Sequence, residues 1–361
     1  MLVHLCCAVD AGYFLKRLKE DFPNEKIVGF FYDPNIQPYN EYLLRMKDTK
    51  RICQKLGIEM IEGDYNYNYW LKRVSGYENE PEKGVRCSIC FDVSLEETAK
   101  TAKKLGHNKI STSLLMSPMK SKEQLSNVGK MIKRVYDIEF IIKDYAQKGG
   151  HQAQQEMAKK EQVYRQDYCG CIFGLIPQRN QRGENRPDEL FSPITKQILP
   201  ASIEEKLEFY KKRDEYDEKG VKYRIVKENF LNYRLLSGKI TIKKETIPSY
   251  ILFYSYLERK NGGRIEIEKD GVYHLNRMQI KFITLKKFNS LLNKNYNSIY
   301  DIYKNPPTIK EEIELREKLL ETKYNLTPLI VLETIPLDKR IDVEIEAKIY
   351  PDNREVFLIL E

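Results

Sequence analysis

The sequence lacks the glycine-rich motifs and long apolar runs that mark several common classes of protein. It contains no Gly-x-x-x-x-Gly-Lys-Ser/Thr loop and no Gly-x-Gly-x-x-Gly turn, which bind nucleotide phosphates and dinucleotides. No stretch approaches the roughly 20 apolar residues that a membrane span needs. Nothing therefore marks an ATP site, a nicotinamide site or a membrane anchor. Without a nicotinamide site, any reducing equivalents that the protein uses would have to come from an external donor.

Signals for secretion and disorder are missing as well. The first residues, Met-Leu-Val-His-Leu-Cys-Cys, lack a basic n-region and a cleavage site, so we expect no secretion signal and a reducing cytoplasm. With 41% hydrophobic and 32% charged residues, the 361-residue chain has the composition of a folded protein of about two domains.

The net charge of +8 is spread evenly along the chain. Residues 1–190 hold 30 Lys and Arg against 26 Asp and Glu, and the remainder holds 31 against 27. This mild excess fits a nucleic-acid partner, but it fits an ordinary protein surface equally well.

Short apolar strands alternate with helices in the first third of the chain, which predicts an α/β domain with a parallel sheet between two helical layers, over residues 1–185. Ligands gather outside the carboxyl ends of such strands, so the loops that follow them would open onto one edge. The expected strands are residues 2–5, 27–32, 59–62 and 109–113, and the expected helices are residues 13–22, 40–56, 67–74 and 88–105.

A polar, breaker-rich run at residues 178–188 predicts a domain boundary. Beyond it, residues 191–361 read as an α+β accessory domain of unknown role. Its expected elements are charged helices near residues 202–216 and 310–324 and hairpins at residues 264–275 and 343–360.

Six of the seven cysteines form three close pairs in distant segments, which predicts a metal ion or iron–sulfur cluster assembled as the chain folds. Asp10 could add an oxygen ligand. A [4Fe–4S] cluster or a structural zinc ion uses about four ligands, so six thiols permit one cluster and a second, mononuclear metal. Spacing alone does not assign each cysteine to a metal. The pairs are Cys6-Cys7, Cys87-x-x-Cys90 and Cys169-x-Cys171.

Plainer interpretations of the same residues stay open at this point. The thiols could be unrelated core residues, because free cysteine is often buried. They could also hold a purely structural zinc ion. Asp10, close to the start of a helix, could act as its N-cap.

Four motifs follow one another in the first half of the chain. They are His4-x-Cys6-Cys7-x-x-Asp10, Asp33-Pro34-Asn35-Ile36-x-Pro38-x-x-Glu41-Tyr42, Arg86-Cys87-x-x-Cys90 and Tyr164-Arg165-Gln166-Asp167-Tyr168-Cys169-Gly170-Cys171. In these motifs the chain resembles the QueH-type epoxyqueuosine reductase family. The resemblance spans about residues 1–175, and several motifs in order are more specific than any one pair. Asp33 stands where the family commonly has Asn, and the resemblance does not extend to residues 191–361.

The resemblance implies a fold similar to the adenine nucleotide alpha hydrolase-like (HUP) domains, with the ATP chemistry lost. It implies reduction of the epoxide of epoxyqueuosine at the wobble position of tRNA to give queuosine. It also implies a [4Fe–4S] cluster beside a mononuclear iron, in agreement with the ligand count above.

Each candidate site residue belongs to one of three groups. The candidate catalytic residues are Asp10, Cys7 and Tyr168. The candidate substrate-binding residues are Asn35, Glu41, Ser113 and Arg165. The candidate metal ligands are Cys6, Cys7, Asp10, Cys87, Cys90, Cys169 and Cys171.

Two other functions are compatible with a thiol-rich α/β domain. A cluster-dependent tRNA thiolation enzyme would need an ATP loop, and residues 6–12 read Cys-Cys-Ala-Val-Asp-Ala-Gly where ATP pyrophosphatases have Ser-Gly-Gly-x-Asp-Ser. A metal-stabilised RNA-binding module without catalysis is the alternative from a different class. Metal analysis would separate them, because a reductase of this kind contains iron and sulfide and the binding module would contain zinc.

Overall fold

The computed structural model describes residues 1–118, 120–181, 197–276 and 280–360. These residues form two compact units. The first contains residues 1–118, 120–181 and 210–224, and the second contains residues 197–209, 225–276 and 280–360. The first four residues of the predicted boundary run, 178–181, belong to a helix, and residues 182–188 lie outside the described residues, so the predicted division into two domains stays a prediction.

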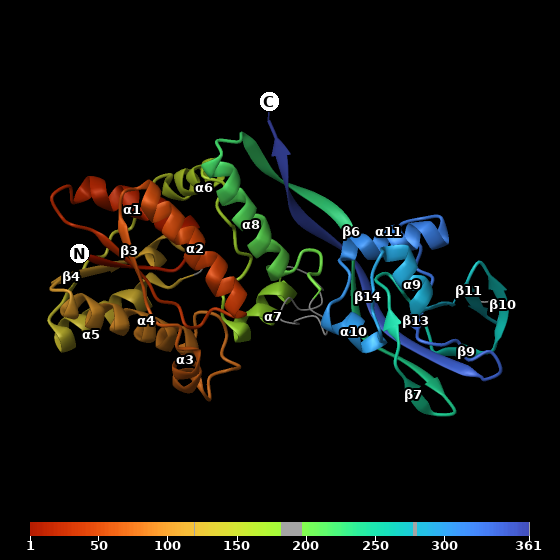
Figure 1. Ribbon diagram of the computed structural model, residues 1–361. Helices are drawn as coiled ribbons and strands as arrows, with labels where there is room; N and C mark the ends of the chain where they lie inside the picture. The colour runs from red at the N-terminus through yellow and green to blue at the C-terminus, as the bar shows by residue number, and fades with distance from the viewer. Residues whose placement is uncertain (119, 182–196, 277–279, 361) are drawn as a thin grey trace. The chain divides into compact units, whose positions relative to one another are not determined.

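The first unit is built on a parallel sheet with helices on both faces (Figure 1). Its strands are β1 (Leu2–Leu5), β2 (Val28–Phe31), β3 (Glu59–Glu62), β4 (Lys109–Thr112) and β5 (Glu139–Phe140). Its helices are α1 (Ala8–Asp21), α2 (Tyr39–Lys55), α3 (Tyr67–Val74), α4 (Val85–Lys104), the short 3₁₀ helix η1 (Ser113–Met116), α5 (Lys122–Tyr136), α6 (Gly150–Lys160) and α7 (Ile172–Gln181).

The strand order of this sheet is β3-β2-β1-β4-β5, and every described pairing in it is parallel. Helices α1 and α2 lie along one face, and α4 and α5 lie along the other (Figure 1). The connections after β1 and β4 therefore leave the sheet toward opposite faces. That divergence opens a crevice at the carboxyl ends of two neighbouring strands, where ligands bind in α/β proteins.

Burial on both faces explains why these strands are short apolar runs. All four residues of β1 and of β2 are buried. A single hydrophobic core extends from Met1 through Trp70 to Ile138, and it holds the strands and their helices together. The rigid sheet thus positions the loop that begins at Cys6.

The second unit contains two further sheets. One has the order β10-β11-β12-β13-β8, with antiparallel neighbours except for the parallel β12 and β13, and the other has the order β7-β6-β14-β9. Its elements are β7 (Glu245–Ile247), β8 (Tyr250–Ile251), β9 (Asn261–Gly263), β10 (Ile265–Lys269), β11 (Val272–Leu275), β12 (Lys281–Thr284), β13 (Leu329–Leu332), β14 (Ile341–Ile359), α9 (Leu285–Leu292), α10 (Ile299–Lys304) and α11 (Ile309–Leu320). The unit boundary falls within α8 (Ile203–Glu218) and β6 (Tyr223–Ile242).

The predicted parallel α/β sheet is confirmed, and so is the hairpin of β10 and β11. The predicted hairpin at residues 343–360 is wrong, because these residues continue as the single strand β14. The turn-forming run Pro351-Asp352-Asn353 does not reverse the chain. Asp352 instead accepts a hydrogen bond from the Asn232 amide (2.9 Å) on the neighbouring β6, which supports continued pairing.

Among the described residues, no helix is both long enough and apolar enough to cross a membrane.

Candidate metal centre

The site begins where β1 ends. Cys6 and Cys7 follow β1 directly, and Ser113 follows the neighbouring strand β4. The backbone N–H of Cys6 donates a hydrogen bond to Ser113 Oγ (3.3 Å), and the Cys6 sulfur lies 3.7 Å from the same oxygen. The parallel pairing of β1 with β4 therefore joins two segments more than 100 residues apart at the crevice.

Cys6, Cys7 and Asp10 form a compact group whose ligand atoms all lie within 4.8 Å of one another. Cys6 Sγ is 3.9 Å from Cys7 Sγ and 3.7 Å from Asp10 Oδ2. Two sulfurs and one carboxylate oxygen at this separation could hold a single metal ion.

Asp10 is not the N-cap of α1, so that simpler interpretation is wrong. The N-cap is Cys7, and Asp10 lies in the first turn of the helix. Its second oxygen, Oδ1, accepts a hydrogen bond of 2.6 Å from Gln154 on α6. Gln154 thereby orients the carboxylate so that Oδ2 faces Cys6, as partners of metal ligands commonly do.

The third thiol pair is held by a turn around Gly170. This glycine has a φ of +102°, and a Cβ there would lie 2.8 Å from Ile36 Cγ1, so a larger residue is disfavoured. The Gly170 carbonyl accepts a hydrogen bond from the Gln37 backbone N–H (2.9 Å), and Ile36 forms a β-bridge with Cys171. Cys169 and Cys171 are thus held against the loop that follows β2.

The second pair, Cys87 and Cys90, lies in the first two turns of α4. The backbone N–H of Lys83 donates a hydrogen bond to the Cys87 sulfur (3.3 Å), which orients this thiol at the start of the helix. Arg86 fixes the start of this helix because its guanidinium donates to the carbonyls of Glu78 (2.6 Å) and Tyr77 (3.3 Å).

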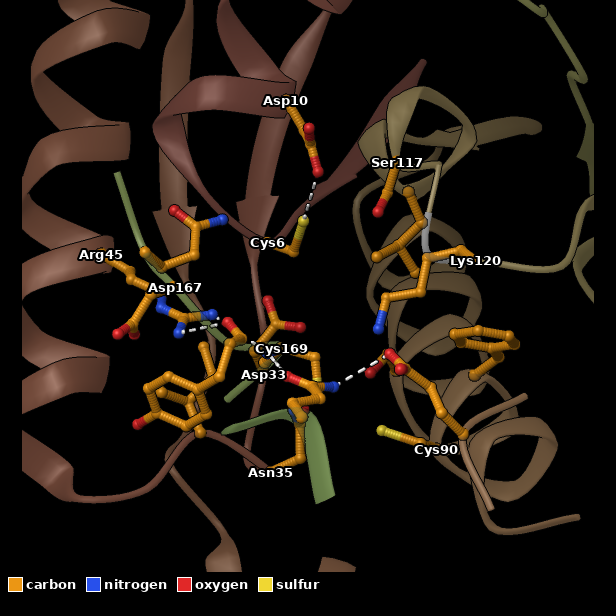
Figure 2. Close-up of a pocket in the computed structure, with 18 of the residues that line it drawn as sticks. Cys6, Asp10, Asp33, Asn35, Arg45, Cys90, Ser117, Lys120, Asp167 and Cys169 are labelled. Carbon is orange, nitrogen blue, oxygen red and sulfur yellow. Dashed lines mark hydrogen bonds between the residues drawn. The ribbon is translucent and has the colours of Figure 1, made fainter. Parts of the chain in front are cut away.

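One cysteine from each pair lines a cavity of about 360 Å³ (Figure 2). These are Cys6, Cys90 and Cys169. The cavity is polar at several points, because Asp10, Asp33, Asn35, Arg45, Glu82, Lys120 and Asp167 line it as well. All seven cysteines are free thiols, so no disulfide removes a potential ligand. The structure therefore brings the three distant pairs to one place, whereas the seventh cysteine, Cys53, is buried in α2.

The surroundings of the thiols shift their pKa values in opposite directions. A hydrogen bond with Cys7, followed by burial, raises the pKa of the Cys6 thiol well above its ordinary value. A hydrogen bond with Cys171 lowers the pKa of Cys169 well below the ordinary value, and Lys120 contributes in the same direction. Burial raises the pKa of Cys90 to about 12 and also raises the pKa of Asp10.

The predicted substrate-binding residues have different positions. Asn35 lines the cavity, and Ser113 is fully buried beside Cys6. Glu41 does not line it, because its carboxylate accepts hydrogen bonds from Arg45 (2.7 Å) and from the Tyr164 hydroxyl (2.9 Å). Arg165 is exposed and does not line the cavity either.

Tyr168, a predicted catalytic residue, lines the cavity, and its hydroxyl donates a hydrogen bond to the Gln37 carbonyl. The Arg45 guanidinium lies 5.2 Å from the centre of its ring. The Tyr168 hydroxyl is thus hydrogen-bonded to the backbone, and the side chain forms part of the cavity wall.

Sequence reasoning missed Arg45, Gln154 and Lys120. Arg45 donates to the carbonyls of Tyr168 (3.1 Å) and Cys169 (3.2 Å), so it positions the last motif. Its spacing of four residues from Glu41 was a signal, because residues i and i+4 are neighbours on a helix. Lys120 follows the loop after β4, which was expected to face the ligand edge, so its position was a signal. No sequence pattern near Gln154 indicated that it contacts Asp10.

These donors fit the groups that the motifs imply. The compact set of Cys6, Cys7 and Asp10 suits a mononuclear metal, and four further thiols equal the usual ligand count of a [4Fe–4S] cluster. Asp33 also lines this cavity, and its buried Oδ2 has no hydrogen-bond partner among the described residues, although it lies 3.5 Å from His4 Nε2.

One similar chain among the solved structures shows a slight likeness. The U34-tRNA thiolase NcsA from Methanococcus maripaludis, solved with its [4Fe–4S] cluster, matches 60% of this chain and 72% of its own with a TM-score of 0.35 and 12% identity. A likeness of this size supports no conclusion about fold or cofactor.

Comparison with known sequences is decisive. A family model described as epoxyqueuosine reductase QueH matches residues 1–176. The epoxyqueuosine reductase QueH of Acinetobacter baylyi is 38% identical over 48% of this chain and 80% of its own. That of Helicobacter pylori is 37% identical over 99% of this chain and 100% of its own, so the second unit is shared with that relative. The chain belongs to the epoxyqueuosine reductase QueH family.

Proposed function

We propose that this protein reduces the epoxide of epoxyqueuosine in tRNA to the alkene of queuosine. Family membership over the whole chain is the observation that supports this most strongly. The reaction breaks both carbon–oxygen bonds of the epoxide, consumes two electrons and two protons, and releases one molecule of water. The electrons would come one at a time from an external donor protein.

We propose that Cys87, Cys90, Cys169 and Cys171 hold a [4Fe–4S] cluster and that Cys6, Cys7 and Asp10 hold a separate iron. The short distances within the second set and the number of thiols in the first support this division. When bound, the cluster would supply electrons and the iron would act as a Lewis acid toward the epoxide.

The protein's own residues would orient the substrate and provide protons. Asn35, at the cavity wall, is available to bind the substrate, while Ser113 positions the backbone of Cys6. Tyr168 would donate a proton to the departing oxygen, since its side chain lines the cavity and Asp10 would serve as an iron ligand. Glu41 would act indirectly by holding Arg45.

The modified base must leave the stack of the anticodon loop to enter the cavity, which single-stranded RNA loops permit. The exposed Arg165 would contact a phosphate beside the cavity. We propose that residues 1–185 form the catalytic domain with a HUP-like fold and that residues 191–361 form an accessory domain. A tRNA substrate would place the protein in the cytoplasm.

The decisive experiment uses the full chain purified without oxygen. Iron and sulfide are quantified, and the protein is incubated with tRNA that contains epoxyqueuosine and with a low-potential reductant. Mass spectrometry of the digested tRNA should then detect queuosine. A fully loaded protein that forms no queuosine would refute the proposed reaction, and a colourless zinc protein that binds tRNA would identify an RNA-binding module instead.

A further inference from the structure

Lys120 is a cation without a fixed partner inside the candidate metal centre. Its side chain lines the cavity, and Figure 2 shows it reaching inward beside Cys90, with Cys6 and Cys169 across from it. Within the described residues, no hydrogen bond or ion pair involves its ammonium group. The nearest characterised contact is the ring of Phe91, whose centre lies 5.9 Å from Nζ.

The arginines of the site differ from Lys120 in this respect. Arg45 is paired with Glu41 and with two backbone carbonyls, and Arg86 is held by the carbonyls of Tyr77 and Glu78. These guanidinium groups are used to fix the local structure. The charge of Lys120 is not committed to any such structural contact in the part of the chain that is described.

The field of Lys120 reaches thiols from all three cysteine pairs. Its side chain lines the same cavity as Cys6, Cys90 and Cys169, one thiol from each pair, and it is only partly exposed to water (Figure 2). Charges in such surroundings interact more strongly than they do in water, because the local dielectric constant is lower.

We propose that Lys120 is an electrostatic tuning residue, whose fixed positive charge raises the reduction potential of the iron–sulfur group held by the surrounding cysteines. Reduction adds one negative charge to that group, and a nearby cation stabilises the reduced state more than the oxidised state. Lys120 thus eases entry of each electron from the external donor. This inference rests on the proposed function, because it requires that the cysteines hold a redox-active cluster.

The test compares reduction potentials rather than turnover. The full-length protein, Lys120→Met and Lys120→Arg are purified without oxygen, and the cluster is titrated with a reductant while its electron paramagnetic resonance signal is followed. Met keeps the length and apolar stem of Lys but removes the charge, whereas Arg keeps the charge. The matched control is Lys122→Met, because Lys122 is nearly half exposed and paired with Asp144.

We expect the midpoint potential of Lys120→Met to shift to more negative values, while Lys120→Arg and Lys122→Met stay close to the wild type. An unchanged potential in Lys120→Met, with the cluster present, would overturn the inference and leave the proposed function intact. Loss of the cluster in both Lys120 variants would make Lys120 a structural residue and would also overturn it. A wild-type protein without a redox-active cluster would instead refute the proposed function itself, and this inference with it.

Discussion

The two units of the chain each contain a cavity of similar size but of different chemistry. The first has a volume of about 360 Å³ and is lined by thiols and by charged groups such as Lys120. The second has a volume of about 310 Å³ and is lined mainly by aromatic and aliphatic side chains, with the buried carboxylate of Glu312 among them.

Both oxygens of the buried carboxylate in the second cavity accept hydrogen bonds. The Glu312 oxygens accept hydrogen bonds from the Tyr250 hydroxyl (2.5 Å), the Phe253 N–H (2.6 Å) and the Gln197 amide (2.6 Å). In the first cavity, no hydrogen bond that involves the Lys120 ammonium or Asp33 Oδ2 is found among the described residues, and the Asp33 oxygen has only the His4 ring nitrogen at 3.5 Å. A buried polar group without a hydrogen-bond partner lowers the stability of the fold. Such groups in the first cavity therefore indicate a functional role rather than a role in folding.

Sheet topology explains why chemically active groups collect in the first unit. Its parallel strands all end at one edge, so the loops after β1, β2 and β4 meet there. The sheets of the second unit are mainly antiparallel, so successive strand ends alternate between opposite edges. Such a sheet does not bring consecutive loops to a single site.

The largest expected effect concerns the thiols of the first cavity. Cys169→Ser should abolish cluster binding and lower queuosine formation by at least about 100-fold, because loss of a ligand should exceed the usual cost of losing an outer-shell partner. Iron and sulfide analysis and the tRNA assay measure the two effects. The control is Cys53→Ala, which should keep both, since Cys53 is buried in α2 away from the cavity. Full iron loading of Cys169→Ser would contradict the ligand assignment.

A buried ion pair of the first unit should affect the stability of the fold, in contrast to the charges without hydrogen-bond partners that line the cavity. Arg213 donates to Asp48 (2.7 Å), and both are almost fully buried. Arg213→Met should lower the free energy of unfolding by about 3–5 kcal/mol, because the buried Asp48 carboxylate loses its closest cation and keeps only Arg51 at 3.8 Å. Urea denaturation measures this change. The double variant Asp48→Leu with Arg213→Met should recover much of the loss, and no recovery would contradict the electrostatic explanation.

The carboxylate of the second cavity should affect stability but not chemistry. Glu312→Ala removes the acceptor of the buried Tyr250 hydroxyl and Phe253 N–H, while the Gln197 amide keeps the Pro307 carbonyl, and should cost on the order of 2–4 kcal/mol in unfolding free energy. Iron content and turnover should remain those of the wild type at a temperature where the variant is folded. A loss of turnover in the folded variant would show that the second cavity takes part in the reaction.

The turn between Cys169 and Cys171 should give a smaller effect. Gly170→Ala should cost about 1–3 kcal/mol, because a side chain is strained at a φ of +102° and a Cβ would approach Ile36. The variant should also lose iron more readily to a chelator. Gly57→Ala is the matched control, since its φ is +66° but no atom lies within 4 Å of the added Cβ. Equal rates of iron loss in the two variants would argue against this role of Gly170.

The pH dependence of stability should reveal the cost of burying Glu312. Burial raises its pKa above the ordinary value of 4.5, so the folded state binds the proton more tightly than the unfolded state. The stability of the wild type relative to Glu312→Gln should therefore fall as pH rises from about 4.5 through the folded pKa, by at most about 1.4 kcal/mol per pH unit. Urea titrations at several pH values would detect this, and a difference that rises with pH would contradict it.

Much of the first unit was predictable from local patterns. The bounds of β1, β3 and α3 agree with the expected ones, because short apolar runs and good helix termini encode such elements directly. Helix α1 was expected at residue 13 but begins at Ala8. The helix begins five residues earlier because the end of β1 leads almost directly into it and because Ala8 and Ala11 are buried on the same face as Leu15 and Leu18.

Several functional contacts had no local signal. Gln154 orients Asp10 from 144 residues away, and Arg213 neutralises Asp48 from 165 residues away. Such pairs depend on how helices pack over the sheet, and packing is a property of the folded chain rather than of a sequence window.

The sequence by itself determined the thiol pairs, the alternation of strands and helices, and the family. Residue type and spacing are sufficient for these, since they follow from side-chain chemistry and backbone periodicity. Only the tertiary structure decided which groups share the crevice, that Glu41 serves Arg45, and that Lys120 joins the cysteines. Their proximity arises from the closing of β1 against β4 and the packing of distant helices around that edge, and no short segment contains that information.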